Sequence, residues 1–184
     1  MKNIINTISN EIKEVLNNVD ENEAIKLSNN IKNAKRIFIS GMGRSGLVGK
    51  MFAMRLMHIG FNVFVVGETI TPSIEKDDLV ILISGSGSTD SQKQFASKAK
   101  DIDAKVALIT TNKESAIGKI SDTVLVIPAA TKKRLPKEPD TIQPLGSQFD
   151  QSAHLLLDSI IVYLLKDVEN KDNDSLVKKH ANLE

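Results

Sequence analysis

The chain has 184 residues, enough for one domain with a sizeable core, and no cysteine, which excludes disulfides, thiolate metal sites and cysteine nucleophiles. Its 24 basic and 23 acidic residues nearly cancel, and no basic stripe with interleaved aromatics appears, so nothing in the charge indicates a nucleic-acid partner. No apolar run approaches the ~20 residues of a membrane span and the N-terminus lacks a signal-peptide core, so we expect a cytoplasmic protein without membrane contacts.

The chain begins with two segments of helical period, 4–16 and 21–33. Five short apolar runs follow, and segments of helical period lie between them. The runs are 36–40, 62–66, 79–83, 105–110 and 123–127, and the intervening helical segments are 47–59, 91–101 and 115–120. Strands that alternate with helices and are continuously apolar indicate a parallel sheet covered on both faces. The predicted fold is therefore α/β, a doubly wound five-stranded parallel sheet with helices on both faces, plus N-terminal helices.

The last third of the chain contains a long polar connection and a strongly apolar helix. Residues 129–146 hold three of the five prolines and fit no regular element, and connections of this length often carry function. Residues 147–166 are apolar around most of a helix, so we expect burial on more than one side, within the domain or against another subunit. We expect a single domain over 1–184, made of a helical segment 1–33, an α/β core 34–168 and a C-terminal tail 169–184. Within the tail, the residues from 175 on are expected to form a short helix or an extended end.

A first glycine loop, GMGRSG at 41–46, follows the first predicted strand and precedes a helix. It matches GxGxxG, a weak pattern that also fits a tight turn with a helix cap. A dinucleotide site would require an acid at the end of the second strand, and Glu68 stands there. This loop alone therefore leaves both interpretations open.

A second loop, SGSGST at 84–89, follows the third predicted strand and opens the next helix. Its four hydroxyls and accessible backbone N–H groups at a helix N-terminus favour an anion. A turn with a cap is the alternative, but four hydroxyls are more than a cap uses. The two loops together favour a phosphate site.

The stretch from Ile37 to Asp90 is similar to the SIS-domain family of sugar isomerases, whose mark is a serine-rich phosphate loop after the third parallel strand. Four segments, GMGRSGLVGKMFAMRLMHIGF, VVGETITPSIEKDDLVILISGSGST, QPLGSQFDQSAHLLLDS and the terminal HANLE, resemble the 6-phospho-3-hexuloisomerase family within it. The resemblance implies interconversion of D-arabino-3-hexulose 6-phosphate and D-fructose 6-phosphate, in formaldehyde assimilation by the ribulose monophosphate pathway. It implies no metal and no organic cofactor, a sugar-phosphate substrate, a homotetramer and functional coupling to 3-hexulose-6-phosphate synthase.

The same resemblance implies the site residues. The catalytic residues would be Asp150, as the base, and His180, as a proton shuttle. Asp150 stands where glutamate is usual in the family, and its alternative role is to cap the first turn of its helix; His180 is otherwise a solvated tail residue. His58 is expected to be structural, and His154 has no assigned role. The substrate would be held by Gly43, Arg44, Ser45, Ser84, Gly85, Ser86, Gly87, Ser88 and Thr89.

The sequence is also compatible with two rival functions. A sugar-phosphate-binding SIS module without turnover is favoured by the aspartate at position 150, although such sensors usually carry an output domain for which these 184 residues leave no room. A nucleotide-binding oxidoreductase would rest on 41–46 alone and would lack a substrate domain.

Overall fold

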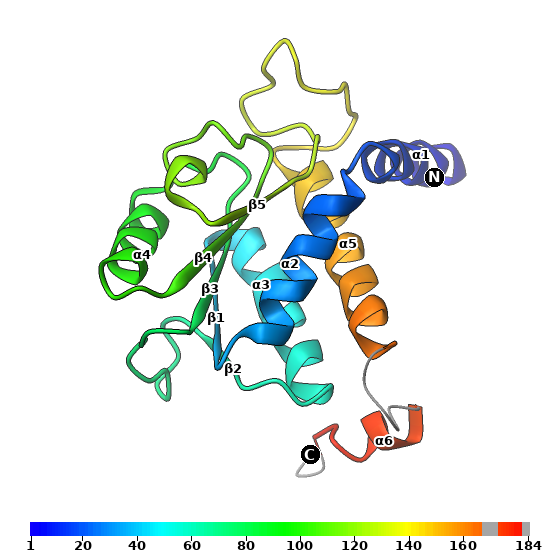
Figure 1. Ribbon diagram of the computed structural model, residues 1–184. Helices are drawn as coiled ribbons and strands as arrows, with labels where there is room; N and C mark the ends of the chain where they lie inside the picture. The colour runs from blue at the N-terminus through cyan, green and yellow to red at the C-terminus, as the bar shows by residue number, and fades with distance from the viewer. Residues whose placement is uncertain (167–172, 182–184) are drawn as a thin grey trace.

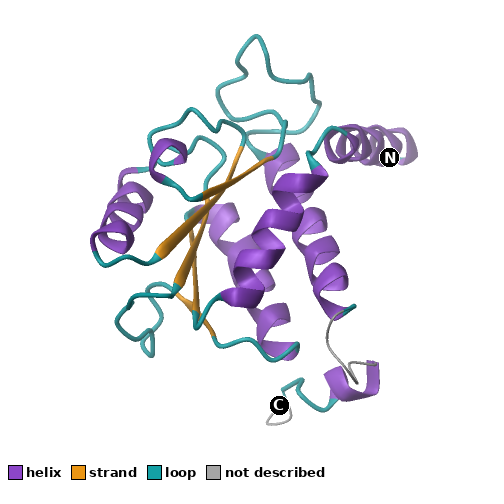
Figure 2. Ribbon diagram, viewed as in Figure 1, coloured by secondary structure: helices purple, strands orange, loops and turns teal. Residues whose placement is uncertain are grey.

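The computed structural model describes residues 1–166 and 173–181 (Figures 1 and 2). In chain order its elements are α1 (Lys2–Asn17), α2 (Glu21–Asn33), β1 (Ile37–Gly41), α3 (Gly43–His58), β2 (Val63–Val65), β3 (Leu79–Ile83), α4 (Asp90–Asp101), β4 (Lys105–Thr110), the single 3-10 turn η1 (Gly118–Ile120), β5 (Thr123–Val126), α5 (Ser147–Leu165) and α6 (Asn173–Val177). None of the helices in these two ranges is both long and apolar enough to cross a bilayer.

All five predicted strands form, and they pair in parallel in the order β2-β1-β3-β4-β5. β3 is the central strand, paired along its whole length with β1 and β4, and every one of its residues is buried. β2 has three residues rather than the five predicted. It lies at the edge of the sheet, where only β1 supports it and its side chains are half-buried.

Helices cover both faces of the sheet, as predicted for a doubly wound fold. Successive side chains of a strand point to opposite faces. Ile39 and Ile81 therefore pack against α2, α3 and α5, whereas Val80 and Leu108 face α4. The cover is unequal: α2, α3 and α5 pack on one face of the sheet, and α4 with the short η1 turn packs on the other (Figure 2). α1 projects beyond this core and packs on α5 (Figure 1).

Two predicted helices differ from the observed ones. α3 begins at Gly43, four residues earlier than predicted, so the last four residues of GMGRSG form its first turn. The predicted helical segment 115–120 contains only the three-residue η1. Six residues are too few to nucleate an α-helix by themselves. The hydroxyl of Ser115 instead accepts the N–H of Gly118 at 3.1 Å, which closes a tight turn.

α5 lies against α1, α2 and α3, which confirms the prediction of burial on more than one side. Its buried side chains include Phe149, Leu157 and Ile160, whereas Leu155 and Val162 are exposed. The N-terminus of α5 lies at the end of the sheet where β1 and β3 end. The long connection 129–146 and α5 together thus bring distant parts of the sequence to the carboxyl edge of the sheet.

Candidate active site

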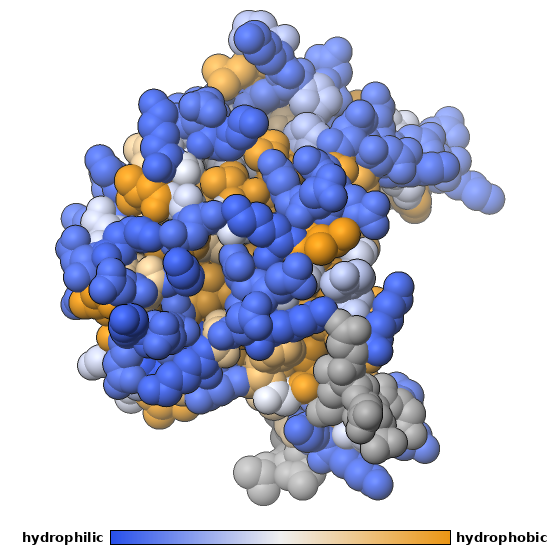
Figure 3. All heavy atoms as spheres, in the orientation of Figure 1, coloured by the Kyte–Doolittle hydropathy of each residue, from blue (hydrophilic) through white to orange (hydrophobic). Residues whose placement is uncertain are grey.

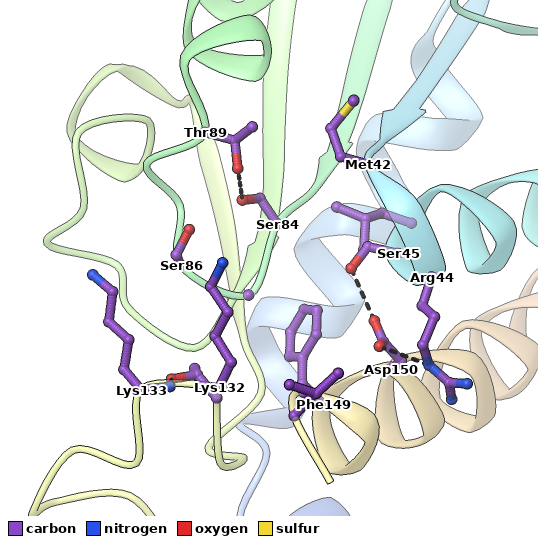
Figure 4. A pocket seen from close by; sticks show the side chains of 15 residues that line it. Met42, Arg44, Ser45, Ser84, Ser86, Thr89, Lys132, Lys133, Phe149 and Asp150 are labelled. Atoms are coloured by element: carbon purple, nitrogen blue, oxygen red, sulfur yellow. Dashed lines mark hydrogen bonds and ion pairs between the residues drawn. The ribbon is translucent and has the colours of Figure 1, made fainter.

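The glycine loop after β1 and the serine loop after β3 lie next to each other at the carboxyl edge of the sheet. β1 and β3 are neighbours, yet the chain continues outward from them in opposite directions, to β2 on one side and to β4 and β5 on the other. Such a reversal leaves the crevice in which open α/β sheets bind ligands. A cavity of about 410 Å³ opens there (Figure 4). Its size is within the range of small-molecule sites.

Seven of the residues predicted to form the site line this cavity: Arg44, Ser45, Ser84, Gly85, Ser86, Thr89 and Asp150. Gly43, Gly87 and Ser88 belong to the same two loops but do not line it. The structure therefore gathers both loops and the carboxylate into one site, although Asp150 is more than a hundred residues from Ser45 in the sequence.

The serine loop (84–89) is held from behind by the end of β4. The carbonyl of Gly85 accepts hydrogen bonds from the N–H of Thr111 at 3.1 Å and from the hydroxyls of Thr110 and Thr111 at 3.1 and 2.8 Å. On the front, the hydroxyls of Ser84 and Thr89 lie 3.4 Å apart, and Thr89 precedes α4 without capping it through its side chain. The hydroxyls and the first N–H groups of α4 are therefore available to an anion in the cavity.

The glycines of GMGRSG serve the close approach of β1 to α3. A Cβ on Gly41 would lie 2.8 Å from the backbone of Ser45, and one on Gly46 would lie 2.7 Å from the carbonyl oxygen of Gly41. This packing aims the first turn of α3, with Arg44 and Ser45, at the cavity. Glu68, the acid a dinucleotide site would need, is exposed and pairs with Lys50 at 2.6 Å instead of lining the cavity.

Asp150 lies in the first turn of α5 but is bound by α3. One carboxylate oxygen accepts the hydroxyl proton of Ser45 at 2.8 Å, and the other lies 3.3 Å from Nε of Arg44 (Figure 4). Asp150 also stands in the first turn of α5, where an acid is favoured, although no side-chain hydrogen bond caps this helix. Its side chain is 9% exposed and borders the cavity. A buried carboxylate with both oxygens held beside an anion pocket is placed to exchange a proton with a bound ligand.

The family model described as SIS domain matches residues 30–142, which is more than half of the 184 residues. The chain belongs to the SIS-domain family. A 3-hexulose-6-phosphate isomerase of Bacillus subtilis is 42% identical to it over 96% of this chain and 95% of the relative. One of Methanocaldococcus jannaschii is 41% identical over 97% of this chain and 96% of the relative.

A solved structure from Methanococcus jannaschii, a hypothetical protein with the inferred function of 3-hexulose-6-phosphate isomerase, superposes on this SIS domain with a TM-score of 0.84. The two chains are 38% identical, and the superposition covers 98% of each. With the two curated relatives, this confirms the resemblance to the 6-phospho-3-hexuloisomerases expected from the sequence.

Within one chain of this SIS domain, His180 lies away from the cavity. Its ring stacks on that of His58, the last residue of α3, with 5.4 Å between the ring centroids. Both histidines line a different cavity, together with residues of α6. Ser45 is thirteen residues earlier on α3, or about 20 Å along the axis at 1.5 Å per residue. Burial, together with Arg55 and His180, lowers the pKa of His58, which favours its neutral form and a structural role.

His154 lies one turn after Asp150 on α5. Its Nε2 is 3.6 Å from the carboxylate of Asp158, and the residue lines a smaller cavity of about 260 Å³ together with Arg44 and Asp150. His154 is thus a neighbour of the candidate site and does not line the main cavity.

The sequence reasoning missed two basic residues of the site, Lys132 and Lys133, which line the main cavity together with Thr131. They belong to the long polar connection that was expected to carry function, but no motif singled them out. The available signal was their position: they follow β5 by a few residues, and loops after parallel strands reach the edge of the sheet where ligands bind.

Residues 131–143, here called the strap, carry these lysines and are held by two carboxylates. Glu138, inside the strap, accepts hydrogen bonds from the N–H and hydroxyl of Thr131 at 2.9 and 2.7 Å and from the N–H of Leu135 at 3.1 Å. Glu11 of α1 accepts from the hydroxyl of Thr141, from the N–H of Ile142 at 2.9 Å and from the side-chain amide of Gln143 at 2.9 Å. These hydrogen bonds tie the strap to itself and to α1 beside the cavity.

These bonds predict a pH dependence of the strap. Burial raises the pKa of Glu11 and of Glu138, but the hydrogen bonds and nearby Arg134 outweigh it, so both pKa values lie below the ordinary 4.5. A carboxyl with a lowered folded pKa stabilises the fold above its unfolded pKa and loses this contribution as the pH falls through its folded pKa. We expect the amide resonances of Ile142 and Leu135 to titrate with midpoints below 4.5 in an NMR pH series. Midpoints at or above 4.5 would contradict these anchors.

Proposed function

We propose that this protein is a 6-phospho-3-hexuloisomerase, which interconverts D-arabino-3-hexulose 6-phosphate and D-fructose 6-phosphate in formaldehyde assimilation by the ribulose monophosphate pathway. The observation that carries the proposal is the single cavity that combines the hydroxyls of Ser84, Ser86 and Thr89 with the held carboxylate of Asp150. One part suits a phosphoryl group, and the other suits proton transfer at a carbon next to a carbonyl.

The reaction moves a carbonyl between C3 and C2. Asp150 removes the proton from C2, the C–H electrons form the C2=C3 bond of a cis-enediol, and O3 takes a proton. Collapse of the enediol then forms the C2 carbonyl, O2 loses its proton, and Asp150 returns a proton to C3. Ser45 keeps the carboxylate oriented through its 2.8 Å hydrogen bond, and the guanidinium of Arg44 supplies positive charge beside the developing enediolate.

His180 is proposed to shuttle the proton between O2 and O3, since an imidazole exchanges protons near neutral pH. In its own chain it lies at the far end of α3 from Asp150, so this role requires the histidine of a neighbouring subunit. Exposed apolar side chains on α3 and α5, namely Leu47, Met54, Leu155 and Val162, support assembly into the expected homotetramer. We place this assembly in the cytoplasm, in functional coupling to 3-hexulose-6-phosphate synthase. Light scattering measures its oligomeric state, and a monomer would contradict an active site shared between subunits.

Substitution of a serine-loop hydroxyl is expected to weaken substrate binding. Ser86→Ala removes a hydroxyl that lines the cavity, and we expect the KM for fructose 6-phosphate to rise about tenfold, the effect of one hydrogen bond to a charged group. Thr89→Ala should act in the same direction. Ser97→Ala, on the exposed face of α4, is the control and should leave KM unchanged. Unchanged binding in both loop variants would contradict a phosphate site here.

A second candidate is a SIS module that binds sugar phosphate without turnover, favoured by the aspartate where the family has glutamate. A coupled assay separates the two functions. The protein is incubated with fructose 6-phosphate, and any 3-keto isomer that forms is cleaved by 3-hexulose-6-phosphate synthase, which releases formaldehyde. If the protein is the isomerase, the coupled reaction releases formaldehyde, and the isomerisation step itself needs no added nicotinamide or metal. Calorimetric binding of fructose 6-phosphate without formaldehyde release would instead identify the binding module.

A further inference from the structure

The strap places two positive charges opposite the serine loop. Lys132 and Lys133 line the cavity together with Ser84 and Ser86, and Figure 4 shows the side chain of Lys132 extending from the strap toward the serine loop. Within residues 1–166 and 173–181 neither ammonium group forms an ion pair. Two uncompensated ammonium groups that face hydroxyl donors across a cavity are suited to an anion bound between them.

A chain of polar contacts links these lysines to the N-terminal helix. Glu11 accepts from the side chain of Gln143, and the backbone carbonyl of Gln143 accepts from the guanidinium of Arg134. Arg134 also donates to the carbonyl of Thr131 at 3.2 Å, directly before Lys132. Arg134 has a φ of 49°, in the left-handed region that non-glycine residues rarely adopt, and these contacts hold it there.

α1 has few other contacts that would explain its position. Its buried residues are Ile12 and Val15, which face α5, and most of its surface is exposed. Hydrophilic side chains cover most of the outer surface of the strap and of α1 in the space-filling view (Figure 3). Glu11 supplies the specific polar connection, with three donors of the strap converging on its carboxylate.

We propose that the strap is a substrate clamp in which Lys132 and Lys133 bind the phosphoryl group from the side opposite the serine loop, and that Glu11 is the positioning residue that holds the clamp from α1. The identity of the ligand as a sugar phosphate rests on the proposed function. The clamp itself needs only a phosphoryl group, so inorganic phosphate can probe it whether or not the protein isomerises sugars.

The test is a double-mutant cycle on the full chain, with calorimetric dissociation constants for inorganic phosphate and for fructose 6-phosphate. Lys132→Met combined with Lys133→Met should raise both constants about tenfold, as expected for loss of charge-assisted contacts. In Glu11→Gln, an amide N–H can replace the carboxylate oxygen that accepts from Thr141 and Gln143. We expect this variant to raise both dissociation constants about threefold to fivefold. Adding Glu11→Gln to the two lysine variants should have no further effect, because a positioning residue acts only through the groups it positions.

Matched controls come from the same elements. Lys137→Met removes a strap lysine outside the cavity, and Glu14→Gln removes a carboxylate one turn after Glu11; neither should change the constants. If Glu11→Gln does not fold, Thr141→Val removes one of the same hydrogen bonds and takes its place in the cycle. Two results would overturn the clamp. One is that Glu11→Gln still raises the dissociation constants when both lysines are already replaced; the other is that the double lysine variant binds phosphate as tightly as the wild type. If the unsubstituted protein binds phosphate but does not isomerise fructose 6-phosphate, that result would count against the proposed function and not against the clamp.

Discussion

Asp150→Asn is expected to lower kcat for the interconversion by about 10²–10⁴-fold, the usual contribution of a general base. The amide keeps the volume of the side chain and an oxygen that can accept from Ser45, so the dissociation constant for fructose 6-phosphate should change little. What disappears is the basic oxygen that takes the proton from C2. The measurement is kcat from the coupled formaldehyde assay, together with calorimetric binding of the same variant.

Two further variants make this experiment specific. Asp150→Glu restores a carboxylate with one more methylene and should recover much of the rate, because the family pattern has glutamate at this position. Asp158→Asn removes a carboxylate from the same helix outside the main cavity and should leave kcat unchanged. A near-normal rate for Asp150→Asn would show that another group is the base.

Gly87→Ala is expected to disrupt the serine loop itself. Gly87 has a φ of 59°, and a Cβ there would lie 2.1 Å from the Oγ and 2.6 Å from the Cβ of Ser115. Rotation of a hydroxyl cannot relieve the contact with Cβ, so the backbone of the loop must move. We expect the free energy of unfolding to fall by about 3 kcal/mol, from the left-handed backbone and the overpacking together. Denaturant titration measures this loss, and KM should rise because the loop no longer presents its hydroxyls.

Gly43→Ala separates the two causes. Gly43 has nearly the same backbone conformation, with a φ of 56°, but nothing lies within 4 Å of a Cβ built there. It should cost only about 1 kcal/mol, the price of the backbone conformation alone. Equal losses for the two variants would mean that the contact with Ser115 has no consequence and that the loop is not held in place as the structure indicates.

Local patterns were enough to predict the elements from which the site is built. The β-branched apolar runs and the loops 41–46 and 84–89 each depend on residues adjacent in sequence, so their structures could be predicted one at a time. The segment 115–120 shows the limit, because its apparent helical period spans too few residues to outweigh the turn closed by Ser115. The resemblance selected Asp150, although no local pattern distinguished a base from a helix cap there.

An α/β chain with a hydroxyl-rich loop at the start of a helix is predictable from the amino-acid sequence, because strand patterning and helix-start chemistry are local properties of the chain. The packing of the whole chain was needed to establish that β1 and β3 are neighbours, that Asp150 reaches Ser45, and that Glu11 contacts the strap carrying Lys132. These contacts join residues far apart in the sequence. They depend on strand order and on how α1 and α5 pack, which no local periodicity specifies.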